Sequence, residues 1–136
     1  MYQQATAADL PMLCNVWQQQ LMCSEKDAKT ILEQVAGLEN IYLCQEENTI
    51  LFFVAAIPVT MEQLPGVYLY GLSACSSSAQ AEHLAGLLEY AKNQQTMKGK
   101  GFAVAAIPSQ YQEVWEQQGF VPYFRRRHLS RSIRRN

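Results

Sequence analysis

The amino-acid sequence predicts one α/β domain, residues 1–136, in which helices cover both faces of a mixed central sheet of about six to seven strands. The first observation behind this is that short β-branched and aromatic runs alternate with amphipathic helical patterns along the whole chain. The second is the composition, because 136 residues with 49% hydrophobic content can bury one core without cross-links. The third is that no repeat or Gly/Ser-rich linker divides the sequence.

The amino-terminal part predicts a short strand followed by two helices. Residues 2–5 are extended, and Thr6 with Asp9 fits a capping box that begins the first helix. Ser24 with Asp27 repeats this pattern before a second helix, which we expect to end at Gly37. The apolar faces of the two helices hold Leu10, Leu13, Cys14, Trp17 and Leu21, and then Ala28, Ile31, Leu32 and Val35.

The middle of the chain predicts an antiparallel hairpin and a further strand. Residues 41–45 and 49–57 are rich in β-branched and aromatic side chains, and the polar segment 46–48 joins them. Pro65 and Gly66 indicate a turn before the next strand, residues 67–75.

The last part predicts two helices that alternate with strands. Ser77 with Gln80 indicates the start of a long helix, whose buried side holds Leu84, Leu87, Leu88 and Ala91. After a turn at residues 97–101, the apolar residues 102–107 predict a strand. Ser109 with Gln112 begins a helix that carries Val114 and Trp115 and ends at Gly119. Residues 120–124 and 126–133 complete the sheet.

The composition also argues against several classes of protein. The four cysteines are scattered without a C-x-x-C pair, and the two histidines, His83 and His128, lie in distant segments. We therefore expect neither a metal site nor a redox dithiol. The longest apolar stretch, residues 49–61, is too short to span a bilayer, and the amino terminus has no basic region followed by an apolar run. These features predict a cytoplasmic protein with no membrane partner.

The arginines are concentrated at the carboxyl terminus, because all six lie between residues 125 and 135. Such a tail could bind nucleic acid through phosphate contacts. We favour a solubilising last strand instead, since base-reading signals and interleaved stacking aromatics are missing. The short, charged last strand also leaves open that it pairs across a homodimer.

Three groups of residues carry a family resemblance through their order and spacing. They are Ala5 to Leu10, then Tyr68 to Leu72 with Leu87 to Ala91, and finally Ala106 to Pro108 with Trp115 to Phe120. Together they resemble the GNAT superfamily of acyl-CoA-dependent N-acyltransferases, namely its opening segment, its central strand and helix, and its closing helix that ends in Gly-Phe. The resemblance covers nearly the whole chain and implies the GNAT fold.

The resemblance also implies a cofactor, acetyl-CoA or CoA, in the place where two central parallel strands splay apart. The strand backbone at Leu72, Ser73 and Ala74 would hold the thioester carbonyl and the pantetheine arm. A family loop of the form Q/R-x-x-G-x-G/A binds the diphosphate, because free amides at a helix start favour an anion and glycines allow close approach. Here it falls on residues 79–84, and the cofactor-binding candidates in it are Gln80, Ala81, Glu82, His83 and Leu84.

This loop departs from the family pattern. Ala79 stands at its cationic or amide position, Glu82 at its first glycine and Leu84 at its last small residue. A carboxylate in the first helical turn would repel a diphosphate by roughly 1–4 kcal/mol at a few ångströms. Leu84 adds bulk. No glycine occurs between Gly71 and Gly86, so no other register restores the pattern.

A second departure concerns proton delivery. Many members place a tyrosine four residues before the final Gly-Phe, where this chain has Trp115, and an indole is not a useful acid. The candidate catalytic residues are Tyr111, one helical turn earlier, and His83, which is either a base for an amine or a solvated surface group. Two hypotheses stay open. One is an N-acetyltransferase acting on a small-molecule or protein amine, and the other is a non-catalytic GNAT-like domain for ligand binding or protein interaction.

Overall fold

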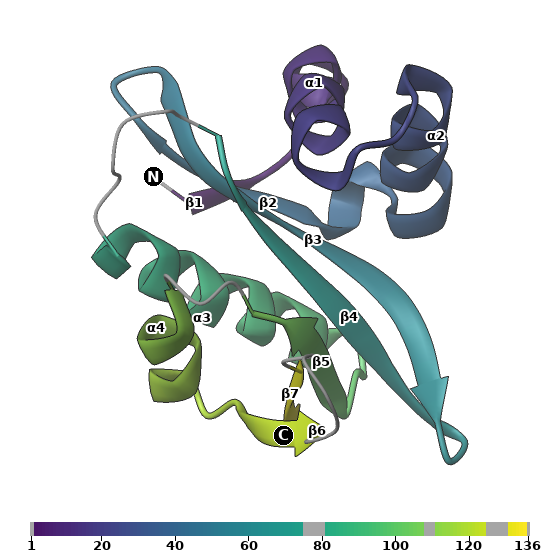
Figure 1. Cartoon of the computed structure of the whole chain (residues 1–136), viewed down its shortest axis with the longest axis vertical. Helices are drawn as coiled ribbons and strands as arrows, with labels where there is room; N and C mark the ends of the chain where they lie inside the picture. Colours follow the sequence, from purple (N-terminus) through teal and green to yellow (C-terminus); the bar gives the residue numbers. More distant parts are fainter. Residues whose placement is uncertain (1, 75–80, 108–110, 125–130, 136) are drawn as a thin grey trace.

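A computed structural model of the chain describes residues 2–74, 81–107, 111–124 and 131–135. It contains the strands β1 (Tyr2–Gln4), β2 (Ile41–Glu46), β3 (Thr49–Met61), β4 (Leu64–Ser73), β5 (Phe102–Ala106), β6 (Val121–Phe124) and β7 (Arg131–Arg135). They form one sheet of seven strands in the order β1-β2-β3-β4-β5-β7-β6 (Figure 1). Neighbouring strands are antiparallel except β4 and β5, which are parallel. The sheet is therefore mixed, as predicted.

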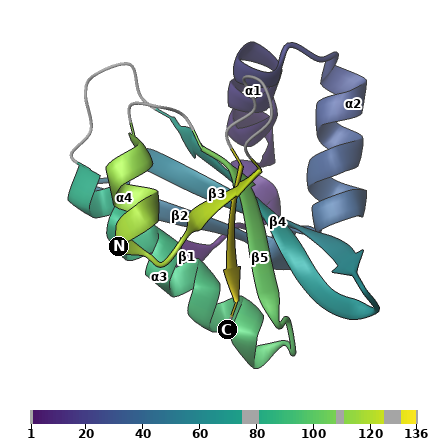
Figure 2. The ribbon, with the colours of Figure 1, turned by 60° about the horizontal axis from the view of Figure 1, so that its bottom comes forward.

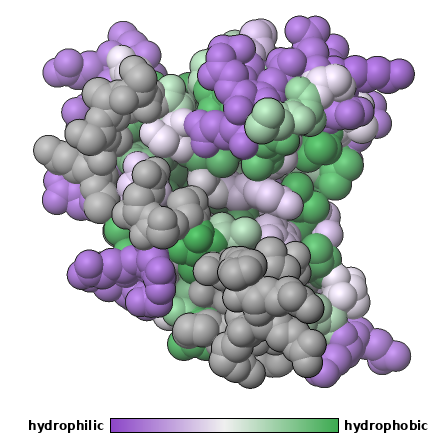
Figure 3. All heavy atoms as spheres, viewed as in Figure 1, coloured by the Kyte–Doolittle hydropathy of each residue, from purple (hydrophilic) through white to green (hydrophobic). Residues whose placement is uncertain are grey.

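Helices cover both faces of this sheet, which confirms the predicted layers (Figures 1 and 2). One face carries α1 (Leu10–Leu21) and α2 (Glu25–Thr30), which continues into the π-helical segment η2 (Ile31–Ala36). The other face carries α3 (Ala81–Met97) and α4 (Gln112–Gln117). Two short 3-10 turns, η1 (Ala7–Asp9) and η3 (Leu38–Asn40), lead into α1 and β2. Each face buries its own apolar cluster, and Figure 3 shows mainly hydrophilic residues over α1 and α2.

Two tight hairpins build the centre of the sheet. The turn residues Glu47 and Asn48 between β2 and β3, and Glu62 and Gln63 between β3 and β4, all have positive φ values. Two-residue turns of this kind match the right-handed twist of the flanking strands. Because the second turn lies at 62–63, the expected turn at Pro65 and Gly66 is wrong. Those two residues lie inside β4 and pair with Thr60 and Val59.

Both helix starts predicted near the amino terminus are confirmed. Thr6 and Asp9 form a capping box, in which the Thr6 N–H donates to Asp9 Oδ2 at 2.8 Å. The Asp27 N–H donates to Ser24 Oγ at 3.1 Å. The predicted burial of Leu21 and Val35 is wrong, since these side chains are 38% and 45% exposed. Leu21 ends α1, and Val35 lies where the wider π-helical turn shifts the helical periodicity.

The long helix α3 packs as predicted at its start and is held by polar contacts at its end. Leu84, Leu87, Leu88 and Ala91 are buried against the sheet. Near its carboxyl end, the buried Gln95 donates from Nε2 to Asn40 Oδ1 at 2.8 Å and to the Tyr42 hydroxyl at 2.7 Å. Lys98 Nζ donates to the same Asn40 oxygen at 2.7 Å. This network ties the end of α3 to the start of β2.

Some predicted boundaries lie outside the described residues, namely the helix caps at Ser77, Gln80 and Ser109 and the strand end at Cys75. The final strand β7 runs on to Arg135, beyond the expected end at residue 133, and lies between β5 and β6. Among the residues with a described conformation, no helix is both long and apolar enough to cross a bilayer.

Candidate active site

The parallel pairing between the central strands β4 and β5 ends before β4 does. Within the described residues their parallel pairing joins Val67 to Ala103 and ends with Leu69 and Ala105, whereas β4 itself continues to Ser73. On its other edge β4 stays paired with β3 as far as Ser73 and Phe52. We call residues 70–73, where β4 has lost β5, the splay. It lies at the carboxyl end of the central strands, which is where ligands bind in open α/β sheets.

Two residues of the splay direct their backbone polar groups away from β3. The Ala74 N–H donates to the Leu51 carbonyl at 2.8 Å, and backbone groups alternate in direction along a strand, so Leu72 also faces β3. Gly71 and Ser73 therefore face the opposite edge. There the Ser73 carbonyl accepts a hydrogen bond from Gln20 Nε2 at 2.6 Å. The last turn of α1 thus contacts the end of β4 directly.

Apolar side chains occupy the α3 and α4 side of the splay. A Cβ built on Gly71 would lie 2.9 Å from Trp115 Cζ2 and 3.8 Å from Leu84 Cδ1. Trp115 and Leu84 are each 1% exposed, and Phe120 packs edge-on against the indole with 5.1 Å between ring centroids. Leu84 therefore places its bulk in the core beside Gly71, and not on the outer surface of the helix start.

Tyr111, the candidate proton donor, lies beside the end of β4. It is the N-cap residue of α4 and is half-buried. Its ring meets the ring of Phe52 edge-on, with centroids 5.7 Å apart, and Phe52 is the β3 partner of Ser73. The fold therefore brings Tyr111 to the splay on the same side as Trp115.

The start of α3 is acidic. Glu82 is exposed in the first turn, and His83 Nε2 lies 3.6 Å from Glu46 Oε2 at the end of β2. Burial raises the pKa of the nearby Tyr2 phenol, and the charges of Cys44, Glu82 and Glu89 raise it further. Two carboxylates thus lie near the helix end to which the dipole would attract an anion.

The predicted strand residues differ in what they can do. Leu72 and Ala74 direct their backbone polar groups toward β3, so Ser73 alone of the three faces the splay with its backbone. Gln80 lies outside the described residues, and of Ala81 only the backbone is described.

Gln20 and Gly71 are not among the sequence candidates, although both lie at the splay. A glycine inside a strand pattern is a usable signal of close approach. Nothing in the sequence distinguishes Gln20 from Gln18 and Gln19, which are its neighbours in the chain.

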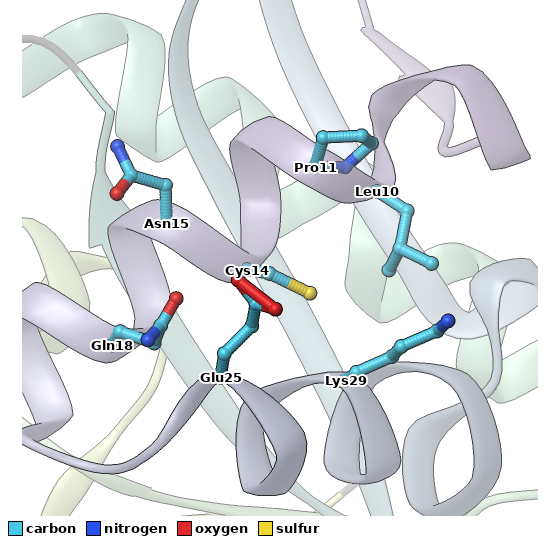
Figure 4. A pocket seen from close by; sticks show the side chains of 7 residues that line it. All are labelled: Leu10, Pro11, Cys14, Asn15, Gln18, Glu25 and Lys29. Atoms are coloured by element: carbon cyan, nitrogen blue, oxygen red, sulfur yellow. The ribbon is translucent and has the colours of Figure 1, made fainter.

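A surface pocket of about 310 Å³ lies between α1 and α2 (Figure 4). The described residues that line it all belong to these two helices: Leu10, Pro11, Cys14, Asn15, Gln18, Glu25 and Lys29. Burial raises the pKa of the Cys14 thiol, and the carboxylates of Glu25 and Glu33 raise it further. Because none of these described lining residues belongs to β4, β5 or α3, the pocket lies apart from the splay.

Metal-binding groups do not gather in the part of the chain with described coordinates, where no three His, Cys, Asp or Glu residues could hold an ion together. The described cysteines Cys14, Cys23 and Cys44 are free.

Solved structures match the chain closely in fold, although no protein-family model and no curated protein sequence matches it. A predicted acetyltransferase from Clostridium acetobutylicum, solved with acetyl-CoA, has a TM-score of 0.76 at 14% identity, covering 96% of this chain and 95% of that one. Ribosomal-protein-alanine N-acetyltransferase from Brucella melitensis also has a TM-score of 0.76 at 14% identity, covering 98% and 96%. A mutant agmatine N-acetyltransferase without ligand has a TM-score of 0.79 at 9% identity, covering 100% and 99%.

The chain has the GNAT acetyltransferase fold. The fold expected from the sequence resemblance is thereby confirmed across the described residues. At such low identities the match shows the arrangement of the GNAT strands and helices alone. The chemistry depends on the residues at the splay.

Proposed function

We propose that the chain is a GNAT-like N-acetyltransferase domain that transfers an acyl group from acyl-CoA to an amine. The splay carries this proposal, because β4 loses its partner β5 after Leu69 while the Gly71 backbone faces that edge, next to the Ser73 carbonyl that Gln20 contacts. A strand edge offers alternating donors and acceptors to an extended ligand. The pantetheine arm of CoA is extended and carries amides that suit such an edge.

The proposed chemistry needs little from side chains. When bound, the donor supplies an electrophilic thioester carbon; the C–N bond to the amine forms, the C–S bond breaks, and the proton of the amine passes to the sulfur. The backbone of β4 orients the carbonyl, and positioning of this kind lowers a barrier without an acid or base. Trp115 excludes water from one side of Gly71. The Tyr111 hydroxyl is the candidate proton donor, because its ring packs beside the end of β4.

We infer that the diphosphate of the donor binds weakly. The amides at the start of α3 favour an anion, but the exposed carboxylates of Glu82 and Glu46 oppose one. A unit charge at about 4 Å contributes about 1 kcal/mol in water. The imidazole of His83 lies beside Glu46 and offsets that charge when it is protonated. The thioester arm therefore fits this chain better than the nucleotide does.

A second candidate function is a non-catalytic GNAT-like domain that binds another ligand or a protein. The packing of Trp115 favours it. The indole takes the position where many GNAT members carry an acidic tyrosine, and together with Leu84 it fills the space beside Gly71. In this alternative, Trp115 and Leu84 pack between the diverging strands in place of a bound acyl-CoA.

Calorimetric titration with acetyl-CoA and with CoA separates the two functions. Heat with micromolar affinity, followed by release of free thiol in the presence of primary amines, is the result expected of a transferase. No heat at millimolar donor would contradict the transferase and favour the non-catalytic domain.

A further inference from the structure

The last turn of α1 brings one side chain, Gln20, to the end of β4. Its Nε2 donates to the Ser73 carbonyl at 2.6 Å, although the two residues are 53 positions apart in the sequence. Trp17, three residues earlier, packs against Tyr70 and Phe53 with ring centroids 5.2 and 6.4 Å away. Residues three apart share one side of a helix. The packing of Trp17 therefore holds Gln20 in register with the splay.

The bond to Ser73 determines which atom of the Gln20 amide can meet a ligand. A glutamine amide has two N–H donors on Nε2 and one acceptor oxygen, Oε1. Nε2 is engaged at Ser73, and no donor from the described part of the chain contacts Oε1. Gln20 is an exposed residue, and its amide lies next to the end of β4.

The two sides of the splay differ in the side chains next to the strand: buried apolar ones on one side and an exposed polar one on the other. On the α3 and α4 side, Trp115 and Leu84 pack against Gly71 and are buried. On the α1 and α2 side, an exposed polar side chain contacts the strand end. A polar second substrate would therefore approach the thioester from the α1 and α2 side.

We propose that Gln20 Oε1 binds the acceptor amine, so that Gln20 is a positioning residue selective for amines that carry N–H groups. This inference rests on the proposed function. One N–H of the amine donates to Oε1, which holds the nitrogen beside Ser73, where a thioester carbonyl aligned along β4 lies. The substrate class is a primary amine or its ammonium form, since a quaternary ammonium has no N–H to donate.

The test measures amine binding without the donor. The ¹⁵N-labelled full chain is titrated with n-butylamine and with n-butyltrimethylammonium, and the spectra follow the Gln20 side-chain NH₂ group and the Ala74 backbone amide. Both signals are expected to shift with n-butylamine and to stay in place with its trimethylated analogue. Gln20→Ala should weaken n-butylamine binding about tenfold, as expected for the loss of one charge-assisted hydrogen bond. Gln19→Ala is the matched control and should bind normally.

Equal shifts with both ligands, or unchanged affinity in a folded Gln20→Ala protein, would overturn the inference. If Gln20→Ala does not fold, Gln20→Met keeps the length of the side chain and removes both polar atoms. The proposed function fails separately if amine binding persists but acetyl-CoA does not bind. If the chain is active, Gln20→Ala should raise the KM for the amine about tenfold with little change in kcat, and an unchanged KM would count against Gln20.

Discussion

The indole of Trp115 lies on the bare backbone of Gly71, so that a Cβ at residue 71 would come within 2.9 Å of Trp115 Cζ2. Gly71 is not one of the positive-φ glycines, so its missing side chain serves close packing and not backbone freedom. This contact closes one side of the strand edge on which the proposed function depends. It is also open to direct test.

Gly71→Ala should destabilise the protein by about 1–3 kcal/mol, because the added methyl overpacks a closed core. Urea unfolding followed by circular dichroism measures the change in the free energy of unfolding. Trp115→Phe shortens the ring, so Gly71→Ala should cost less in that background, and a double-mutant cycle reports the difference. Identical costs in both backgrounds would mean that the indole does not limit the space at residue 71.

Gln95→Leu should destabilise the protein by about 1–3 kcal/mol, because it removes the donor to the buried Tyr42 hydroxyl and one of the two donors to Asn40. The matched control is Gln94→Leu, at the neighbouring half-buried position in α3. Thermal unfolding of the two variants gives the comparison. Equal melting temperatures would show that the network adds nothing beyond helix packing.

The stability of the chain should fall as the pH rises through 9, and Cys44 should account for part of the fall. Burial raises the pKa of its thiol above the ordinary value of 9.0, the charge of Glu46 raises it further, and the amino terminus lowers it. The unfolded thiol therefore ionises first. Above pH 9 the unfolded state then holds fewer protons than the folded one. The contribution of Cys44 to stability is therefore fully present below pH 9 and is lost as the pH rises above it.

The slope of this loss should be steeper in the wild type than in Cys44→Ala, by up to about 1.4 kcal/mol per pH unit. Urea unfolding between pH 8 and 10.5 measures it, and Cys23→Ala, in the loop between α1 and α2, is the control. Parallel slopes for the wild type and Cys44→Ala would show that Cys44 does not contribute to the loss of stability at high pH.

Glu82→Gln should tighten CoA binding about fivefold at low salt, because it removes a carboxylate from the first turn of α3. The gain should shrink at high ionic strength, since exposed charges are screened. Glu89→Gln, farther along the exposed side of the same helix, is the matched control. Leu84→Gly would not test this site, because it would empty a buried position and destabilise the fold. Equal affinities for the wild type and Glu82→Gln would mean that the diphosphate does not lie at this helix start.

The sequence predicts the elements of this fold well wherever the signal is local. Thr6 with Asp9 and Ser24 with Asp27 mark helix starts, because a cap and its amide lie three residues apart. The buried side of α3 follows from its periodicity. The predictions for Pro65 and Val35 fail for local reasons as well, namely a positive-φ turn at 62–63 and a π-helical turn, neither of which has a distinctive residue pattern here.

The site is predicted less completely. The resemblance to a family leads to the strand end at Ser73, to Tyr111 and to the loop before α3, and the sequence pattern adds the mixed sheet with helices on both faces. Only the tertiary structure decides that β4 loses β5 after Leu69, that Trp115 lies on Gly71, and that Gln20 reaches Ser73 where Gln18 and Gln19 do not. Caps, turns and periodicity act within a few residues of the chain. Contacts across 53 residues depend on how whole helices and strands pack, and no single segment encodes that packing.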